Sequence, residues 1–273
     1  MTSHTVMELP NFSSTYPVSD EQIAFYQQNG YVQFDNVLSP SEVAVLQTAM
    51  DRAKNQRDGF VRDLGGGKDG NEAILQMLNL WQHHPEIKQY LFGGRIAQMA
   101  AALTNSSEIR IYHDQALIKE PGPSAPSPWH QDQPYWPSKE GGMLSCWMAL
   151  DDVTIDRGCM QFIPGSHHWG EFDPIEFTGD GPGLMDLISA EQRAAWKPQA
   201  VELKACSCTF HHGLCFHYAA PNTTEFRRRA LVAIFIPDGI TYAADEKMSS
   251  PFDNTITAKK GEALRGTDFA QLL

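Results

Sequence analysis

From Ile109 to about residue 240, the sequence consists of short β-prone runs separated by turns rich in Gly, Pro and Asn. Short strands broken by frequent turns favour an antiparallel sandwich or a barrel. The chain has 273 residues, which is within the range of a single β domain that also carries helices. We therefore expect one domain, mainly β with flanking helices, that spans residues 1–273.

The segment before this region is predicted to be mostly helical over residues 19–108. The expected elements are a helix over 20–28 capped by Asp20 and ended by Asn29-Gly30, a strand over 31–37, a helix from the capping box Ser39-Pro40-Ser41-Glu42 to about Lys54, a flexible loop over 59–70, and helices over about 72–81 and 85–103. These helices would buttress the β region.

Three other segments lack a regular period. Residues 1–18 are predicted to be an irregular arm, and residues 241–273 a C-terminal tail. An acidic insertion rich in Pro and Gly, over about 170–197, interrupts the β region and carries a predicted helix near 189–195. An insertion of this length is either a lid or a surface excursion.

Composition excludes several classes of partner. The net charge of −12 argues against binding to a phosphate backbone, and no nucleic-acid partner is expected. The apolar runs are shorter than a membrane span, and the N-terminus lacks the pattern of a signal peptide. We expect a cytoplasmic protein with a small-molecule substrate. The five cysteines lack zinc or redox spacing, which favours reduced thiols in the core.

The most specific chemical feature is His130-Gln131-Asp132. On an extended segment, side chains two residues apart point to the same face, so this triplet offers a metal one nitrogen and one oxygen ligand. A later histidine would complete the 2-His-1-carboxylate triad of non-haem Fe(II) oxygenases, which leaves coordination positions open for a cosubstrate and O₂. His217 is the candidate for that ligand.

Arginines follow His217 after a turn-like Ala-Pro-Asn-Thr cluster. In a strand starting near Phe226, Arg227 and Arg229 share one face and Arg228 takes the other. One of these faces must be buried, and a buried guanidinium requires an anion, which a planar carboxylate fits best. The distal carboxylate of 2-oxoglutarate would be such an anion; a solvated basic run is the alternative.

Together these motifs resemble the phytanoyl-CoA dioxygenase family of Fe(II)/2-oxoglutarate oxygenases. The resemblance rests on the central His130/Asp132, on His217 followed by Ala-Pro-Asn222, on Arg228 eleven residues after that histidine, and on the flanking segments 112–119, 146–152 and 158–167. It implies a double-stranded β-helix, or jelly roll, and Fe(II), 2-oxoglutarate and O₂ as cofactors. It also implies that Gln115 and Trp147 line the 2-oxoglutarate pocket. One position departs from the pattern, because Ala219 stands where some members have a serine that binds the cosubstrate.

Further residues near the expected metal are candidates for substrate contact. Gln133, Tyr135 and Trp136 directly follow Asp132 and would project toward the open coordination positions if the strand continued. His211 lies six residues before His217, which would put both on one strand face and favours a role for His211 beside the ligands or the substrate.

The reaction expected from this reading is hydroxylation of a small metabolite, with release of succinate and CO₂. Halogenation by related enzymes requires a small residue in place of the carboxylate ligand, and Asp132 is present. Two alternatives remain, a non-oxidative isomerase or hydrolase that uses another metal, and a non-catalytic module that binds 2-oxoglutarate or a metabolite. The sequence does not identify the primary substrate or the oligomeric state.

Overall fold

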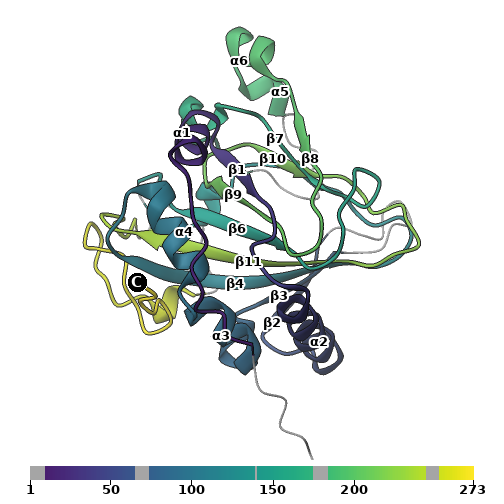
Figure 1. Cartoon of the computed structure of the whole chain (residues 1–273). Helices are drawn as coiled ribbons and strands as arrows, with labels where there is room; N and C mark the ends of the chain where they lie inside the picture. Colours follow the sequence, from purple (N-terminus) through teal and green to yellow (C-terminus); the bar gives the residue numbers. More distant parts are fainter. Residues whose placement is uncertain (1–9, 65–73, 139, 175–183, 244–251) are drawn as a thin grey trace, which may run out of the picture.

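The computed structural model describes residues 10–64, 74–138, 140–174, 184–243 and 252–273 (Figure 1). Its strands form two antiparallel sheets, as expected for a jelly roll. In spatial order, the seven-stranded sheet contains β1 (Tyr31–Phe34), β9 (Cys208–His212), β6 (Leu144–Ala149), β11 (Arg228–Pro237), β4 (Ile109–Lys119), β3 (Ile74–Leu78) and β2 (Phe60–Leu64). The four-stranded sheet contains β5 (Ser127–His130), β10 (His217–Ala219), β7 (Met160–Phe162) and β8 (Gln199–Val201).

The central strand β11 contributes side chains to two hydrophobic clusters, one on each face of the large sheet. Leu231, Ala233 and Phe235 point to the helical side, whereas Val232 and Ile234 belong to the cluster between the sheets. Side chains alternate along a strand, so a strand buried on both faces reads as a continuous apolar run. The same alternation places Arg228 on the inner side, with Val232.

Helices cover the outer face of the large sheet, and α4 lies across β4, β6 and β11 (Figure 1). These helices are α1 (Asp20–Asn29), α2 (Pro40–Gln56), α3 (Pro85–Phe92) and α4 (Arg95–Thr104). The shorter α5 (Leu184–Leu187) and α6 (Ala190–Ala195) lie in the insertion, away from this face (Figure 1). The capping box at Ser39 begins α2 as predicted. The cap of α1 was misassigned, because Ser19 rather than Asp20 accepts the hydrogen bond from the backbone of Gln22.

The helix predicted over 72–81 is wrong over residues 74–81, and residues 72 and 73 are outside the described part of the chain. Residues Ile74–Leu78 form β3, which pairs with β2 and with β4, and Leu80–Gln82 form a single 3₁₀ turn. The apolar residues of this segment fit a helical stripe as well as a strand, and pairing with the exposed edge of β4 decides between them. Strand β2 likewise lies inside the loop predicted over 59–70, of which residues 65–70 are outside the described part of the chain.

The single helix predicted over 85–103 is two helices separated at Gly93 and Gly94. Gly94 has φ of +90°, and a Cβ on Gly93 would lie 2.7 Å from the Cβ of Phe12. This close approach shows that the described part of the N-terminal arm, residues 10–18, is packed into the fold although it is irregular, whereas residues 1–9 are outside the described part. The Phe12 ring is buried and meets Tyr90 edge-on at 5.8 Å.

The tail and the insertion differ in how they join the core. Phe269 and Leu264 of the tail are buried, and Gln271 pairs with Arg110 of β4. The insertion carries α6 as predicted, next to β8 (Figure 1), but residues 175–183 are outside the described part and a lid role stays a prediction. None of the described helices is long and apolar enough to cross a membrane.

Candidate active site

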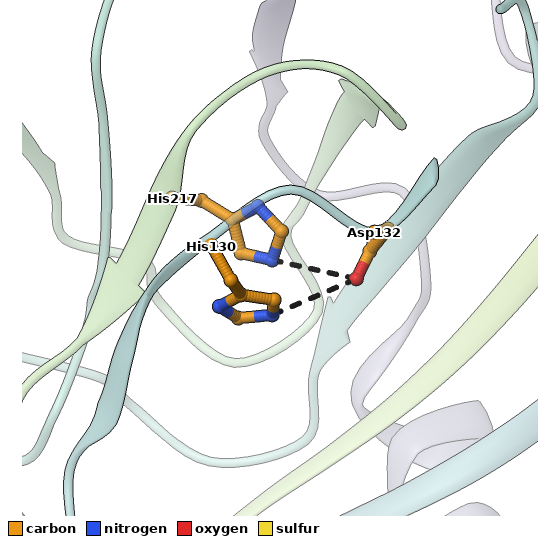
Figure 2. Close-up of side chains that lie close together, drawn as sticks. All are labelled: His130, Asp132 and His217. Carbon is orange, nitrogen blue, oxygen red and sulfur yellow. Dashed lines mark ion pairs between the residues drawn. The ribbon is translucent and has the colours of Figure 1, made fainter. Parts of the chain in front are cut away.

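Three of the predicted residues converge at one point between the sheets (Figure 2). His130, Asp132 and His217 offer ligand atoms that all lie within 4.8 Å of one another. The Oδ1 atom of Asp132 lies 3.6 Å from Nε2 of His130 and 3.7 Å from Nε2 of His217. Two imidazoles and one carboxylate in this arrangement can hold one divalent metal and leave further positions open.

The local path of the chain differs from the extended segment assumed for His130 and Asp132. Strand β5 ends at His130, and Asp132 begins a 3₁₀ turn with φ of −78° and ψ of −37°. The backbone N–H groups of Asp132 and Gln133 both donate to the carbonyl of Gly213, at 2.9 and 3.0 Å. A turn held by Gly213, rather than strand alternation, therefore brings the carboxylate beside the histidines.

Both histidine rings are oriented by a backbone carbonyl. Nδ1 of His130 donates to Pro128 O at 2.7 Å, and Nδ1 of His217 donates to Cys215 O at 3.0 Å. Because Nδ1 carries the proton, the lone pair lies on Nε2, which faces Asp132. Burial lowers the pKa of each ring to about 4 despite the nearby carboxylate, so both are neutral and able to bind a metal at pH 7.

Asp132 is held in its ionised form. Burial alone would raise the pKa of this carboxyl, but His217, His211 and His130 outweigh burial and hold the pKa well below its usual range. The site thus combines two neutral imidazoles with one carboxylate, which is the protonation state that metal binding requires.

His211 reaches the site by a route that the sequence did not indicate. His211 lies on β9 of the large sheet and His217 on β10 of the small sheet, because the turn over 213–216 separates them. The expectation that they share one strand face is wrong. The two rings nevertheless approach to 4.5 Å, from opposite layers, and His211 Nε2 lies 3.2 Å from Oδ2 of Asp132.

The three arginines divide as the alternation allows. Arg228 is buried, with 2% of its surface exposed, whereas Arg227 and Arg229 form ion pairs with Asp51 and other acids on the outer side. The guanidinium of Arg228 lies 5.2 Å from the ring centre of Trp147. Its Nε and Nη1 atoms have no hydrogen-bond partner among the described residues. Burial lowers its pKa to about 10, so it is still charged at neutral pH and can accept an anion.

A cavity of about 360 Å³ opens onto the three candidate ligands. Gln115 and Trp147 line it, as do Tyr135 and Trp136. Gln133 does not occur among its described lining residues, and its predicted substrate contact stays a prediction. Its side chain is fully buried, and its amide donates to Ser138 Oγ at 2.6 Å.

Sequence reasoning missed three polar residues of this region. His113 lines the cavity, and Ser145 donates to Asp132 Oδ2 at 3.1 Å. Lys119 is buried and donates to Ala220 O at 2.6 Å, in the turn after His217. The one available signal was a lysine directly after the apolar run Ala116–Ile118 at the end of β4, since a buried lysine requires specific partners.

An aromatic cluster links the ligand strands to the insertion. Trp129 directly precedes His130, and Tyr218 directly follows His217; their rings stack at 5.3 Å. Trp196, the residue directly after α6, packs against Trp129 with ring centres 5.2 Å apart. The insertion therefore contacts the residues adjacent to two candidate ligands.

A comparison with protein families decides the class to which this site belongs. A model of the family described as phytanoyl-CoA dioxygenase (PhyH) matches residues 26–230, which is more than half of the chain. The chain belongs to the phytanoyl-CoA dioxygenase family. Peroxisomal phytanoyl-CoA dioxygenase of Rattus norvegicus is 22% identical over 228 residues, covering 78% of this chain and 67% of that protein. The dioxygenase lolE1 of Epichloe uncinata is 27% identical over 228 residues, covering 82% and 85%.

Solved structures with similar folds include two enzymes of nogalamycin biosynthesis. The non-haem α-ketoglutarate-dependent carbocyclase SnoK has a TM-score of 0.80 and 26% identity, covering 97% of this chain and all of that one. The epimerase SnoN, in complex with Fe³⁺, α-ketoglutarate and nogalamycin RO, has a TM-score of 0.77 and 26% identity, covering 93% and 98%. The expectation of iron and 2-oxoglutarate, which is α-ketoglutarate, is confirmed for the phytanoyl-CoA dioxygenase family.

The residues of this chain fit those two groups. Two neutral imidazoles and an ionised carboxylate are a donor set suited to Fe(II). The unpartnered Nε and Nη1 of buried Arg228 fit a carboxylate in the same interior. A buried guanidinium without an anion would otherwise be costly to the fold.

Proposed function

We propose that this protein is an Fe(II)- and 2-oxoglutarate-dependent hydroxylase of a small-molecule metabolite. The observation that carries the proposal is the convergence of His130, Asp132 and His217 in one cavity, with the unpartnered guanidinium of Arg228 buried nearby. Iron and 2-oxoglutarate, when bound, would supply the O₂-dependent oxidation, with succinate and CO₂ as coproducts.

The protein residues would act by position and charge. His130, Asp132 and His217 would hold the metal, and Arg228 would bind the distal carboxylate of 2-oxoglutarate with Gln115 and Trp147 lining that end of the cavity. Tyr135 and Trp136 would form the wall against which the substrate packs. Trp136 is only 4% exposed, so its ring presents a fixed apolar surface.

The volume of the cavity and the net charge of the protein support a small substrate without a CoA group. A cavity of about 360 Å³ falls at the lower end of typical small-molecule sites. The sequence carries a net charge of −12 and has no basic patch suited to the phosphates of CoA. The small-molecule proposal therefore does not extend to an acyl-CoA.

The similarity to a carbocyclase and an epimerase supports two other outcomes for the same site. Ring closure, epimerisation and hydroxylation can each start with removal of hydrogen from a substrate C–H bond, and they differ in product mass. Hydroxylation adds one oxygen atom, ring closure removes two hydrogens, and epimerisation leaves the mass unchanged.

The test begins with succinate release from 2-oxoglutarate by the purified protein, with and without Fe(II). We expect iron-dependent succinate in the wild type and none in His130→Ala or His217→Ala. The control is the conversion to alanine of His168, an exposed residue of the 3₁₀ helix Ser166–Trp169. Incubation with metabolite pools and mass spectrometry would then identify the product. Normal turnover in either triad variant would contradict the metal assignment. Binding of 2-oxoglutarate in the absence of iron, without release of succinate, would favour a non-catalytic module.

A further inference from the structure

Two residues of the large sheet contact the same oxygen of Asp132. His211 on β9 and Ser145 on β6 are directly opposite each other in the register of that strand pair, and both are at most 2% exposed. Side chains at opposed positions of adjacent strands lie on the same face. His211 Nε2 is 3.2 Å from Asp132 Oδ2, and Ser145 Oγ donates to the same atom at 3.1 Å.

These contacts make the two carboxylate oxygens unequal. Oδ1 faces the Nε2 atoms of His130 and His217 at 3.6 and 3.7 Å. Oδ2 instead accepts hydrogen bonds from His211 and Ser145. An oxygen that already accepts two hydrogen bonds is a poor metal ligand, and groups that hold the ligands in this way set their orientation. The carboxylate is therefore prepared to bind through one oxygen.

The proton on His211 can be assigned from its surroundings. A histidine that faces an ionised carboxylate donates through the facing nitrogen, so the proton lies on Nε2. Nδ1 is then an acceptor, and it is buried without a hydrogen-bond partner among the described residues. A phenylalanine could fill the same space beside Phe162, whose ring lies at 5.5 Å, without leaving a polar atom unsatisfied. The imidazole is thus costly to the fold unless its Nε2–H has a role.

We propose that His211, together with Ser145, is a positioning residue that restricts Asp132 to one-oxygen coordination of the iron. A carboxylate that bound through both oxygens would occupy a position which 2-oxoglutarate or O₂ needs. The inference rests on the proposed function, because it assumes that His130, Asp132 and His217 hold the metal.

The experiment uses Co(II) as a probe in the full-length protein, because its visible absorption reports coordination number and geometry. The variants are His211→Phe, which keeps the ring and removes the donor, His211→Gln, which restores an N–H donor, and Ser145→Ala. The matched control is Thr209→Val, a buried position on β9 two residues before His211 and on the same face. Co(II) affinity, the absorption spectrum and thermal unfolding are measured for each.

We expect His211→Phe to weaken Co(II) binding by about 10- to 100-fold and to change the absorption spectrum toward a higher coordination number. Glutamine should restore part of the affinity and spectrum, Ser145→Ala should show a smaller change in the same direction, and Thr209→Val should match the wild type. A folded His211→Phe variant with wild-type affinity and spectrum, or equal losses in the phenylalanine and glutamine variants, would overturn the positioning role.

The outcomes separate this inference from the proposed function. If the wild type bound no Co(II) or Fe(II), both would fail. If the wild type bound metal and His130→Ala did not, while His211→Phe behaved like the wild type, the metal site would stand and only the role of His211 would fall.

Discussion

Lys119 and Arg228 lie directly opposite each other in the β4–β11 pair, and their side chains are 0% and 2% exposed. Two neighbouring buried cations repel each other, and the weaker one loses its proton. Burial, together with the charge of Arg228, lowers the pKa of Lys119 to about 6. At neutral pH, Lys119 is therefore an amine that donates to the carbonyl of Ala220, and Arg228 carries the charge.

The first prediction concerns the pH dependence of stability from Lys119. The pKa of this lysine is depressed in the folded state, so the unfolded chain binds more protons between pH 6 and about 10 and stability rises with pH across that window. The slope is at most ~1.4 kcal/mol per pH unit. Urea unfolding at several pH values should show a flatter profile for Lys119→Met than for the wild type. Parallel profiles would mean that the lysine is charged in the folded protein.

The second prediction concerns Arg228. Removing one partner of a buried charge-assisted pair costs on the order of 2–5 kcal/mol, so Arg228→Ala should raise the 2-oxoglutarate concentration needed for half-maximal succinate release by tens-fold or more. Lysine should rescue only in part, because its point charge cannot make two parallel hydrogen bonds. Arg227→Ala is the control, since its side chain is 35% exposed and paired with Asp51 and Glu120. A comparable effect in the control would indicate a diffuse basic surface instead.

The third prediction concerns His113. Burial lowers the pKa of this ring to about 4, whereas an unfolded histidine has a pKa near 6.5. The unfolded chain therefore binds more protons between these values, and stability falls as the pH drops from about 6.5 to 4. The measurement is the difference between the free energies of unfolding at pH 7 and at pH 5. His113→Phe should make this difference smaller than in the wild type by ~1–3 kcal/mol. An unchanged difference between the two pH values would show that the ring titrates normally.

The fourth prediction concerns the close contact between Gly213 and Trp136. A Cβ on Gly213 would lie 2.4 Å from the Cζ3 atom of Trp136, so the indole ring or the turn carrying Asp132 must move in Gly213→Ala. We expect a loss of ~1–3 kcal/mol in stability and weaker Fe(II) binding. The double variant with Trp136→Phe should recover part of both, because the smaller ring relieves the contact. If the double variant recovered neither stability nor Fe(II) binding, the loss would come from the backbone around Gly213 and not from the contact with Trp136.

The sequence predicted the parts of the fold whose signals are local. The capping box at Ser39 depends on neighbouring residues. Strand alternation separated Arg228 from Arg227 and Arg229, and the family resemblance indicated Arg228 as the inward one, which its burial confirms. The linked motifs around His130, His217 and Arg228 were together sufficient to predict the family and its cofactors. Assignment of His130, Asp132 and His217 as iron ligands, the single domain and the cytoplasmic location stay predictions.

The errors arose where distant segments decide the structure. Ile74–Leu78 is a strand because β4 offers it a free edge, and no local pattern states this. The contact between His211 and Asp132 depends on two sheets meeting, and the burial of Gln133 depends on a turn fixed by Gly213 from another part of the chain. The sequence identified the reactive residues more reliably than the residues that hold them in place.

The position of Asp132 between the layers has a mechanical consequence. His130 and His217 stand on the small sheet, whereas Ser145 and His211, which bind the carboxylate, stand on the large one. A bound iron would join His130 and His217 of the small sheet to Asp132, which is hydrogen-bonded to the large sheet, and would therefore link the two layers. Strands β5 and β10 have only four and three residues, and short elements with few backbone hydrogen bonds open locally at low cost. Their amide hydrogens should therefore exchange with solvent much faster in the metal-free protein than in the loaded one, while those of β11 exchange at similar rates in both.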